Sequence, residues 1–151
     1  MRESTLCYLF KDHQVLLMHR IYKKDDYNEN MWIGVGGKVE NESVLDCLKR
    51  EVLEETGLSL NHYQFYGHVY FYEETYHEHM HLFISEDFNG TLKQSVEGYL
   101  AFVDIDQLET LPMWEGDDIF LKRILDKTPF VALHLFYEQK KLKNYYFEDT
   151  V

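Results

Sequence analysis

The chain begins with two apolar runs separated by a short polar turn. The runs TLCYLF (5–10) and QVLLMHR (14–20) flank the turn KDH, which predicts a hairpin of buried strands. A polar loop, IYKKDDYNEN, then leads into the β-rich segment MWIGVGGKV, which is interrupted by glycines. Glycines at a strand end indicate a place where the backbone passes close to another group or adopts positive φ.

The next stretch has the period and the end signals of an amphipathic helix. Ser43 is a suitable N-cap with Asp46 three residues later, and Gly57 stands where a C′ glycine belongs. The helix should therefore cover residues 44–56. Its apolar positions form one stripe at about 100° per residue, made of Val44, Leu45, Leu48 and Val52.

The remainder of the chain alternates strand patterns with two further helical segments. Aromatic and β-branched residues predict strands in 63–76, 78–88 and 98–105, a short helical turn in 106–111, a helix in 116–127 and a closing hairpin in 129–149 around EQKK. We see no repeat or linker, so residues 1–151 should form a single domain of the α+β class, a mixed β-sheet between helices.

One edge of the predicted helix is unusually acidic. Glu51, Glu54 and Glu55 lie side by side, and like charges at these spacings repel one another. A divalent cation would balance them, since hard cations prefer carboxylate oxygens on a rigid support. Each glutamate taken singly would be an ordinary surface residue.

The stretch that contains these glutamates resembles the Nudix box, G-x5-E-x7-R-E-U-x-E-E-x-G-U with U apolar. All of its fixed positions are present: Gly36, Glu42, Arg50, Glu51, Val52, Glu54, Glu55, Gly57 and Leu58. The loop between Glu40 and Glu42 is one residue shorter than in common relatives, which read G-G-K-U-E-x-G-E-T.

The resemblance implies a Nudix-type α/β/α sandwich and a hydrolase that requires Mg²⁺ or Mn²⁺. It implies that Glu51, Glu54 and Glu55 are metal ligands, one of which can act as a base through water, and that Arg50 orients them. Gly36 would add a backbone carbonyl and Glu97 a further carboxylate, although Glu97 is equally well read as a turn residue.

Other segments are similar to the MutT-like 8-oxo-dGTP diphosphatases, namely MWIGVGGKV, VDIDQL and LPMWEGDDIFLKRIL. This resemblance implies a base pocket that contains Trp114 and Asp117, with Asp118 assigned to it less securely. An indole stacks on purines, and a carboxylate accepts hydrogen bonds from the N1–H and N2–H edge of guanine. Plain core packing is the alternative for Trp114, and a helix cap or first-turn acid for the two aspartates.

Further substrate contacts are assigned to Gly37 and Lys38. Ile33 departs from relatives that carry Asn at this place, and an apolar side chain cannot read a base edge by hydrogen bonds. Arg20, Lys23 and Lys24 could meet phosphates, but the pattern favours a solvated loop for all three. His77, His79 and His81 share one strand face that could bind a transition metal, although a half-exposed strand face is favoured.

The net charge and the cysteines of the chain limit its expected binding partners and its expected cellular compartment. A net charge of -12 argues against binding to a nucleic-acid polymer, so the expected partner is a small nucleotide. Cys7 and Cys47 should be buried free thiols, which suits a reducing cytoplasm, and no segment has the length of a signal peptide's apolar run or a membrane span. The oligomeric state is left open.

The leading hypothesis is a pyrophosphohydrolase that converts 8-oxo-dGTP to 8-oxo-dGMP and pyrophosphate. The alternatives are a Nudix hydrolase acting on a dinucleoside polyphosphate or ADP-ribose, and a nucleotide-sensing module without catalysis. Loss of a box glutamate would favour the sensing module, and none is lost.

Overall fold

A computed structural model describes residues 1–149 of the chain. The strands are β1 (Arg2–Lys11), β2 (Gln14–His19), β3 (Trp32–Ile33), β4 (Val35–Lys38), β5 (Leu58–Glu73), β6 (Tyr76–Gly90), β7 (Tyr99–Asp104), β8 (Ala132–Glu138) and β9 (Lys141–Glu148). The helices are α1 (Val44–Thr56), a 3-10 turn η1 (Ile105–Thr110) and α2 (Glu115–Leu125).

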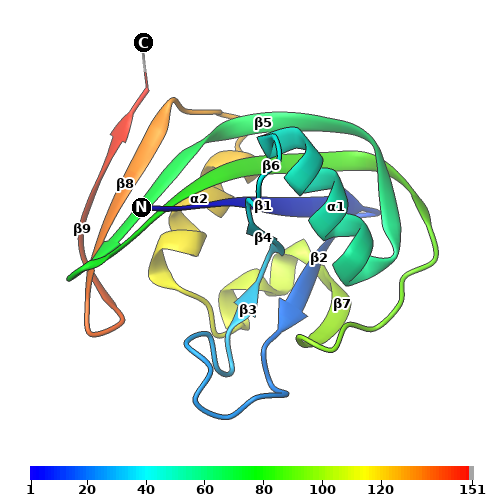
Figure 1. Cartoon of the computed structure of the whole chain (residues 1–151), viewed down its shortest axis with the longest axis horizontal. Coiled ribbons are helices and arrows are strands. Elements are labelled where there is room, and N and C mark those ends of the chain that lie inside the picture. The colour runs from blue at the N-terminus through cyan, green and yellow to red at the C-terminus, as the bar shows by residue number, and fades with distance from the viewer. Residues whose placement is uncertain (150–151) are drawn as a thin grey trace.

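The strands form one mixed sheet with the order β3-β2-β1-β6-β5-β8-β9, while β4 pairs with β1 and β7 with β2. Pairing is parallel between β1 and β6 and between β5 and β8, and antiparallel elsewhere. The sheet lies between the two helices, with α1 on one face and α2 on the other (Figure 1). This arrangement confirms the predicted α+β sandwich.

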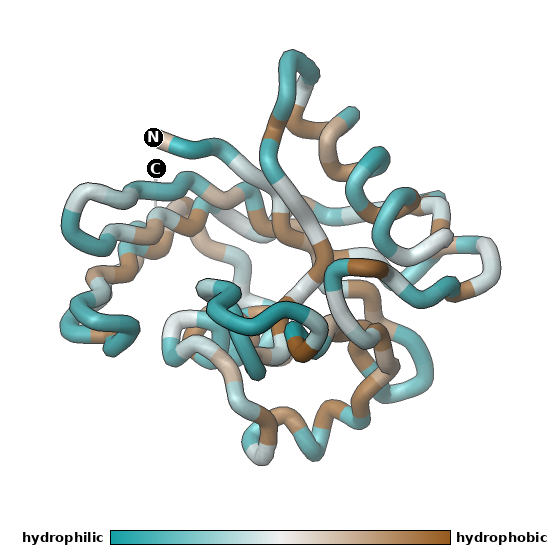
Figure 2. The backbone as a smooth tube through the Cα atoms, turned by 60° about the horizontal axis from the view of Figure 1, so that its bottom comes forward, coloured by the Kyte–Doolittle hydropathy of each residue, from teal (hydrophilic) through white to brown (hydrophobic). Residues whose placement is uncertain are grey.

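Alternating side chains of β1 divide the interior into two cores. Cys7 packs with Leu48 on the α1 side, whereas Tyr8 packs with Phe120 on the α2 side at a ring distance of 5.9 Å. Figure 2 shows apolar and polar stretches alternating along the strands and helices, with predominantly hydrophilic loops. Because side chains alternate between the two faces of a strand, the strands contribute apolar residues to the cores beneath both helices.

The helix α1 has the predicted bounds and the predicted caps. The Ser43 hydroxyl accepts a hydrogen bond from the backbone N–H of Asp46 at 3.1 Å, and Gly57 adopts the left-handed conformation at φ 79°. The predicted apolar stripe was wrong at Leu45, whose side chain is 42% exposed, because Cys47, Leu48 and Val52 are the helix residues turned onto the sheet.

The prediction for the two cysteines is confirmed. Cys7 and Cys47 are both buried and free. The short loop before α1 closes with Asn41 at φ 47°, a conformation that asparagine tolerates better than most residues. Within residues 1–149, neither helix has the length and hydrophobicity needed to span a membrane.

Candidate active site

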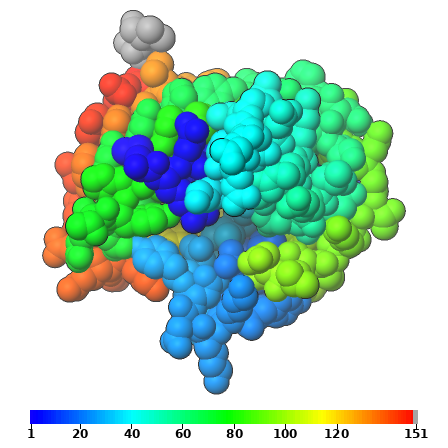
Figure 3. Space-filling model, in the orientation of Figure 1, coloured from blue at the N-terminus to red at the C-terminus, as the bar shows by residue number. Residues whose placement is uncertain are grey.

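A cleft of about 1090 Å³ opens between the acidic edge of α1 and the start of α2. Its walls include the glycine strand β4, the loop residues 26–28, the segment 93–97 and the β6 residues Glu78 and Met80. Figure 3 shows the surface hollowed between the cyan region that leads into α1 and the blue loop that follows β2. Carboxylates lie at one end of this cleft and aromatic side chains at the other.

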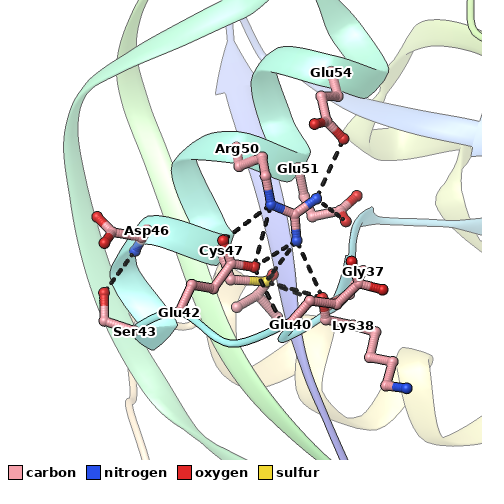
Figure 4. A network of polar contacts seen from close by, with 11 residues as sticks. Gly37, Lys38, Glu40, Glu42, Ser43, Asp46, Cys47, Arg50, Glu51 and Glu54 are labelled. Carbon is pink, nitrogen blue, oxygen red and sulfur yellow. Dashed lines mark hydrogen bonds and ion pairs between the residues drawn. The ribbon is translucent and has the colours of Figure 1, made fainter.

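Arg50 organises the acidic end through a set of ion pairs (Figure 4). Its guanidinium donates to Glu42 at 2.5 Å, to Glu51 at 2.8 Å and to Glu54 at 3.3 Å, and it also reaches the backbone carbonyl of Lys38 at 3.2 Å. The bond from Arg50 lowers the pKa of Glu42 to about 2. The predicted role of Arg50 as an orienting residue agrees with this geometry, and Glu42 is its main anchor.

Glu55 has a different environment from the glutamates that Arg50 holds. Burial, a hydrogen bond and the negative charge of Glu51, and the charge of Glu97 raise the pKa of Glu55 to about 8, while Arg20 opposes the shift. A bound cation would neutralise this excess of negative charge. The donor set therefore fits a divalent metal with hard oxygen ligands, and Glu97 faces the same cleft from the segment before β7.

The three box glutamates do not converge on one point. Among residues 1–149, the three-residue groups whose ligand atoms lie within 4.8 Å of one another do not include Glu51, Glu54 and Glu55 together. Arg50 holds the carboxylate of Glu54 at 3.3 Å, and the side chain of Glu54 is 60% exposed. Glu51 and Glu55 are the pair that lie close enough for Glu51 to raise the pKa of Glu55.

Two glycines allow strand β4 to lie against its neighbours. A Cβ on Gly36 would be 1.9 Å from the carbonyl oxygen of Thr5, and a Cβ on Gly37 would be 2.4 Å from the carboxyl carbon of Glu51. The carboxylate of Glu51 thus occupies the space that a side chain at 37 would fill. The glycines of the box are required for this close approach of strand and helix.

The aromatic end of the cleft is built around Trp114. This side chain is 7% exposed, donates from Nε1 to Asn28 at 2.8 Å, and is stacked on Tyr27 at 5.2 Å with an interplanar angle of 16°. Trp114 is therefore both a core residue and part of the cleft wall. Tyr27, which is 43% exposed, supplies the more accessible aromatic face.

Asp117 lines the aromatic end of the cleft from the first turn of α2. Burial and, to a lesser degree, the neighbouring Asp118 raise the pKa of Asp117 to about 8. The helix cap alternative does not apply to Asp117, because Trp114 is the N-cap residue and has no side-chain cap bond. Asp118 is exposed and is not among the residues that line the cleft.

Some of the remaining predicted contact residues line the cleft, and others lie outside it. Gly37, Lys38 and Ile33 line the cleft, and Lys38 is exposed there. The preference for a solvated loop was wrong for Arg20, whose side chain is 17% exposed and pairs with Asp26 at 2.9 Å. Lys23 and Lys24 are exposed and lie outside the residues that line the cleft.

Several cleft residues were missed by the sequence reasoning. They include Asp26, Tyr27, Asn28, Phe71 and Tyr76. The first three lie in the polar loop IYKKDDYNEN, whose aromatic content was the available signal, while the other two lie in strands whose register the sequence does not reveal.

An acidic helix edge beside a glycine strand, opening into an aromatic cleft, defines the site of a metal-assisted hydrolase of phosphoanhydrides. A family profile described as NUDIX domain matches residues 1–124, and the chain belongs to this family. It is a hydrolase of the Nudix type, a family that acts on pyrophosphate bonds of nucleotides and generally uses divalent metal.

Individual relatives agree with this assignment. The chain is 32% identical over 147 residues to an oxidized purine nucleoside triphosphate hydrolase from Mus musculus, covering 95% of this chain and 92% of the relative. It is 32% identical over 91 residues to an 8-oxo-dGTP diphosphatase from Buchnera aphidicola, covering 57% and 70%. A MutT protein from Bacillus halodurans superimposes with a TM-score of 0.87 at 26% identity, covering 100% of both chains.

Proposed function

We propose that this hydrolase cleaves oxidised purine nucleoside triphosphates, with 8-oxo-dGTP as its main substrate, to the monophosphate and pyrophosphate. The observation that carries the proposal is the position of Asp117, a partly buried residue whose carboxyl group lines the aromatic end of a cleft whose other end is acidic. The relatives named above, which act on oxidised purine nucleotides by their descriptions, support the same substrate class.

The metal is proposed to be Mg²⁺ or Mn²⁺, held by Glu51, Glu55 and Glu97 with the Gly36 carbonyl, and by Glu54 once it leaves Arg50. When bound, such ions neutralise phosphate charge and make a water molecule a stronger nucleophile. Arg50 keeps Glu51 in place through its 2.8 Å bond. Gly37 leaves room for that carboxylate, and Lys38, exposed at the cleft, attracts the phosphate chain.

At the other end of the cleft, Trp114 and Tyr27 provide the stacking surface for the purine, and Asp117 binds its hydrogen-bonding edge. Because burial raises the pKa of Asp117 to about 8, the carboxyl group is largely protonated at neutral pH and both donates and accepts. Asp118, which is exposed, is proposed to act only through its charge on Asp117.

The setting of this activity is also a proposal. Residues 1–151 are proposed to form a single domain that works in the cytoplasm, since both cysteines are free and buried as a reducing compartment allows. The proposed partner is the small nucleotide, with no nucleic-acid polymer or membrane, because the net charge of -12 repels polyanions.

The test is a panel of 8-oxo-dGTP, dGTP, dATP, a dinucleoside polyphosphate and ADP-ribose, each assayed for release of pyrophosphate and phosphate with Mg²⁺ and with excess EDTA. We expect 8-oxo-dGTP to give the highest kcat/KM, pyrophosphate as the product, and no turnover in EDTA. A higher kcat/KM for ADP-ribose or the dinucleoside polyphosphate would support another Nudix substrate. Binding without turnover of any of them would support a sensing module.

Variants of the box separate catalysis from folding. Glu55→Gln should lower kcat by roughly 10²-fold or more, as should Glu54→Gln, because each removes a metal ligand. Arg50→Ala should also slow turnover by releasing the carboxylates. Glu74→Gln, an exposed position outside the cleft, is the matched control and should retain wild-type kcat. Full activity of the Glu55 variant would contradict the metal assignment.

A further inference from the structure

A cluster of histidines lies on the face of the sheet that α1 partly covers, outside the residues that line the cleft. Side chains of β6 alternate, so that Glu78 and Met80 line the cleft while His79 and His81 point to the α1 side. In Figure 1 the N-terminal end of β1 lies beside β5 and β6 to the left of α1, and this part of the sheet is left uncovered by the helix.

Three neighbouring strands bring the cluster together through their register. His68 on β5 pairs with His81 on β6, and Glu3 on β1 pairs with His79 on β6. His77, His79 and His81 share one face of β6 as predicted, but His77 is exposed, packs against Tyr72 and is not part of the convergent group. The third histidine is His68, which is contributed by the adjacent strand.

The side-chain nitrogens converge closely. Nδ1 of His68 lies 2.7 Å from Nε2 of His79, and one ligand atom from each of His68, His79 and His81 lies within 4.8 Å of the others. A carboxylate borders the group, since Oε2 of Glu3 is 3.0 Å from Nε2 of His81 and 3.8 Å from Nδ1 of His79, the ring nitrogen opposite the one that faces His68. Ligand atoms around a tetrahedral zinc ion are about 3.4 Å apart, as bond lengths of about 2.0 to 2.1 Å require.

The surroundings favour neutral, oriented imidazoles. The ring of Tyr70 stacks on His79 at 4.4 Å, and on its other side on His134 at 4.9 Å, which fixes the ring plane of His79. Burial and the two neighbouring histidines lower the pKa of His79 to about 4, and burial also lowers that of His68. Neutral rings carry the lone pairs that metals bind.

We propose that His68, His79 and His81 form a binding site for a transition-metal ion of the Zn²⁺ type, with Glu3 beside it. Three imidazoles, with water in the remaining position, are a ligand set that suits Zn²⁺, Ni²⁺ or Cu²⁺ and not Mg²⁺, which prefers oxygen ligands. The site joins β1, β5 and β6, and it stabilises the folded protein by mass action. The three histidines are not among the residues that line the nucleotide cleft.

The test is a titration of metal-free protein, prepared without an affinity tag, with Zn²⁺ in the presence of excess Mg²⁺ so that oxygen-ligand sites are filled. Calorimetry should show binding of one Zn²⁺ per chain, and the melting temperature should rise with Zn²⁺ concentration. Co²⁺ used in place of Zn²⁺ should give the visible absorption band of a tetrahedral site. A wild-type protein without saturable Zn²⁺ binding overturns the proposal.

Variants identify the ligands. His79→Gln and His68→Gln should each weaken Zn²⁺ binding by at least about 100-fold, the upper end of what a lost supporting group costs. Glu3→Gln should weaken it less, and unchanged binding in that variant would show that Glu3 does not support the site. His77→Gln is the matched control, because this exposed histidine lies on the same strand and outside the cluster. An equal loss in His77→Gln would show adventitious binding by surface histidines and overturn the site.

Discussion

Replacing Asp117 by Asn should stabilise the protein, and the gain in unfolding free energy over the wild type should increase with pH. In the folded state burial raises the pKa of this carboxyl group to about 8, whereas the ordinary aspartate value is 3.8. The folded state therefore binds the proton more tightly than the unfolded state. The stabilisation from this proton is fully present below pH 3.8 and is lost as the pH rises through about 8. Asparagine has almost the same shape and carries no proton to lose.

The size of the effect follows from the difference between the two pKa values. Between these values, each pH unit should cost the wild-type protein about 1.4 kcal/mol of unfolding free energy relative to Asp117→Asn. Between pH 5 and pH 7 the difference in unfolding free energy between the two proteins should therefore grow by about 2.7 kcal/mol. This corresponds to roughly 5 to 10 °C in Tm for a chain of this length. Contributions from other titrating groups, Glu55 included, cancel in the comparison because both proteins contain them.

The assay is urea denaturation of both proteins at several values of pH between 4 and 8. Asp126→Asn is the matched control, since it removes the same charge from an exposed position at the other end of α2. The control should follow the wild-type profile with pH. If the curves of wild type and Asp117→Asn run parallel across this range, the carboxyl group is ionised in the folded protein, and the argument for a protonated Asp117 fails.

Three further predictions concern other parts of the structure. Gly37→Ala should reduce turnover strongly with 8-oxo-dGTP, because the added Cβ would lie 2.4 Å from the Glu51 carboxyl carbon, and wild-type kcat would show that the strand can move away. Trp114→Ala should weaken nucleotide binding by about 1 to 3 kcal/mol, measured by calorimetry with a non-hydrolysable analogue; unchanged affinity would leave Tyr27 as the stacking residue. Mass spectrometry of unreduced protein should show the full thiol mass, and a two-dalton deficit would indicate a disulfide between Cys7 and Cys47.

The helix α1 could be predicted from the sequence because its signals are local. Ser43 and Gly57 lie within one turn of the ends that they define, and both caps are formed as predicted. The apolar stripe was less predictable, since Leu45 is as hydrophobic as Leu48 but is exposed. Which apolar residues of a helix face the sheet depends on how the helix is rotated against it, and that rotation is set by tertiary packing.

The contacts that the sequence did not reveal are those made between distant segments. Arg20 pairs with Asp26 and approaches Glu97 at 3.8 Å, although 77 positions separate Arg20 from Glu97 in the chain. His68 joins His79 because a hairpin with register shifts aligns them across two strands. Strand register depends on long-range pairing, and a short sequence pattern carries no information about it.

The two ends of the cleft belong to different cores, and this separation has consequences for specificity. The acidic end depends on α1, Arg50 and β4, whereas the base-binding end depends on α2 and the loop that contains Tyr27. Changes in the second region can alter the preferred base without moving the carboxylates of the first. Because Ile33 offers no hydrogen bond, we expect discrimination between guanine-type and adenine-type nucleotides to rest on Asp117. Asp117→Ala, which removes both the donor and the acceptor, should therefore change the ratio of kcat/KM for 8-oxo-dGTP and dATP far more than it changes the metal requirement, and an equal slowing of all substrates would make Asp117 a structural residue.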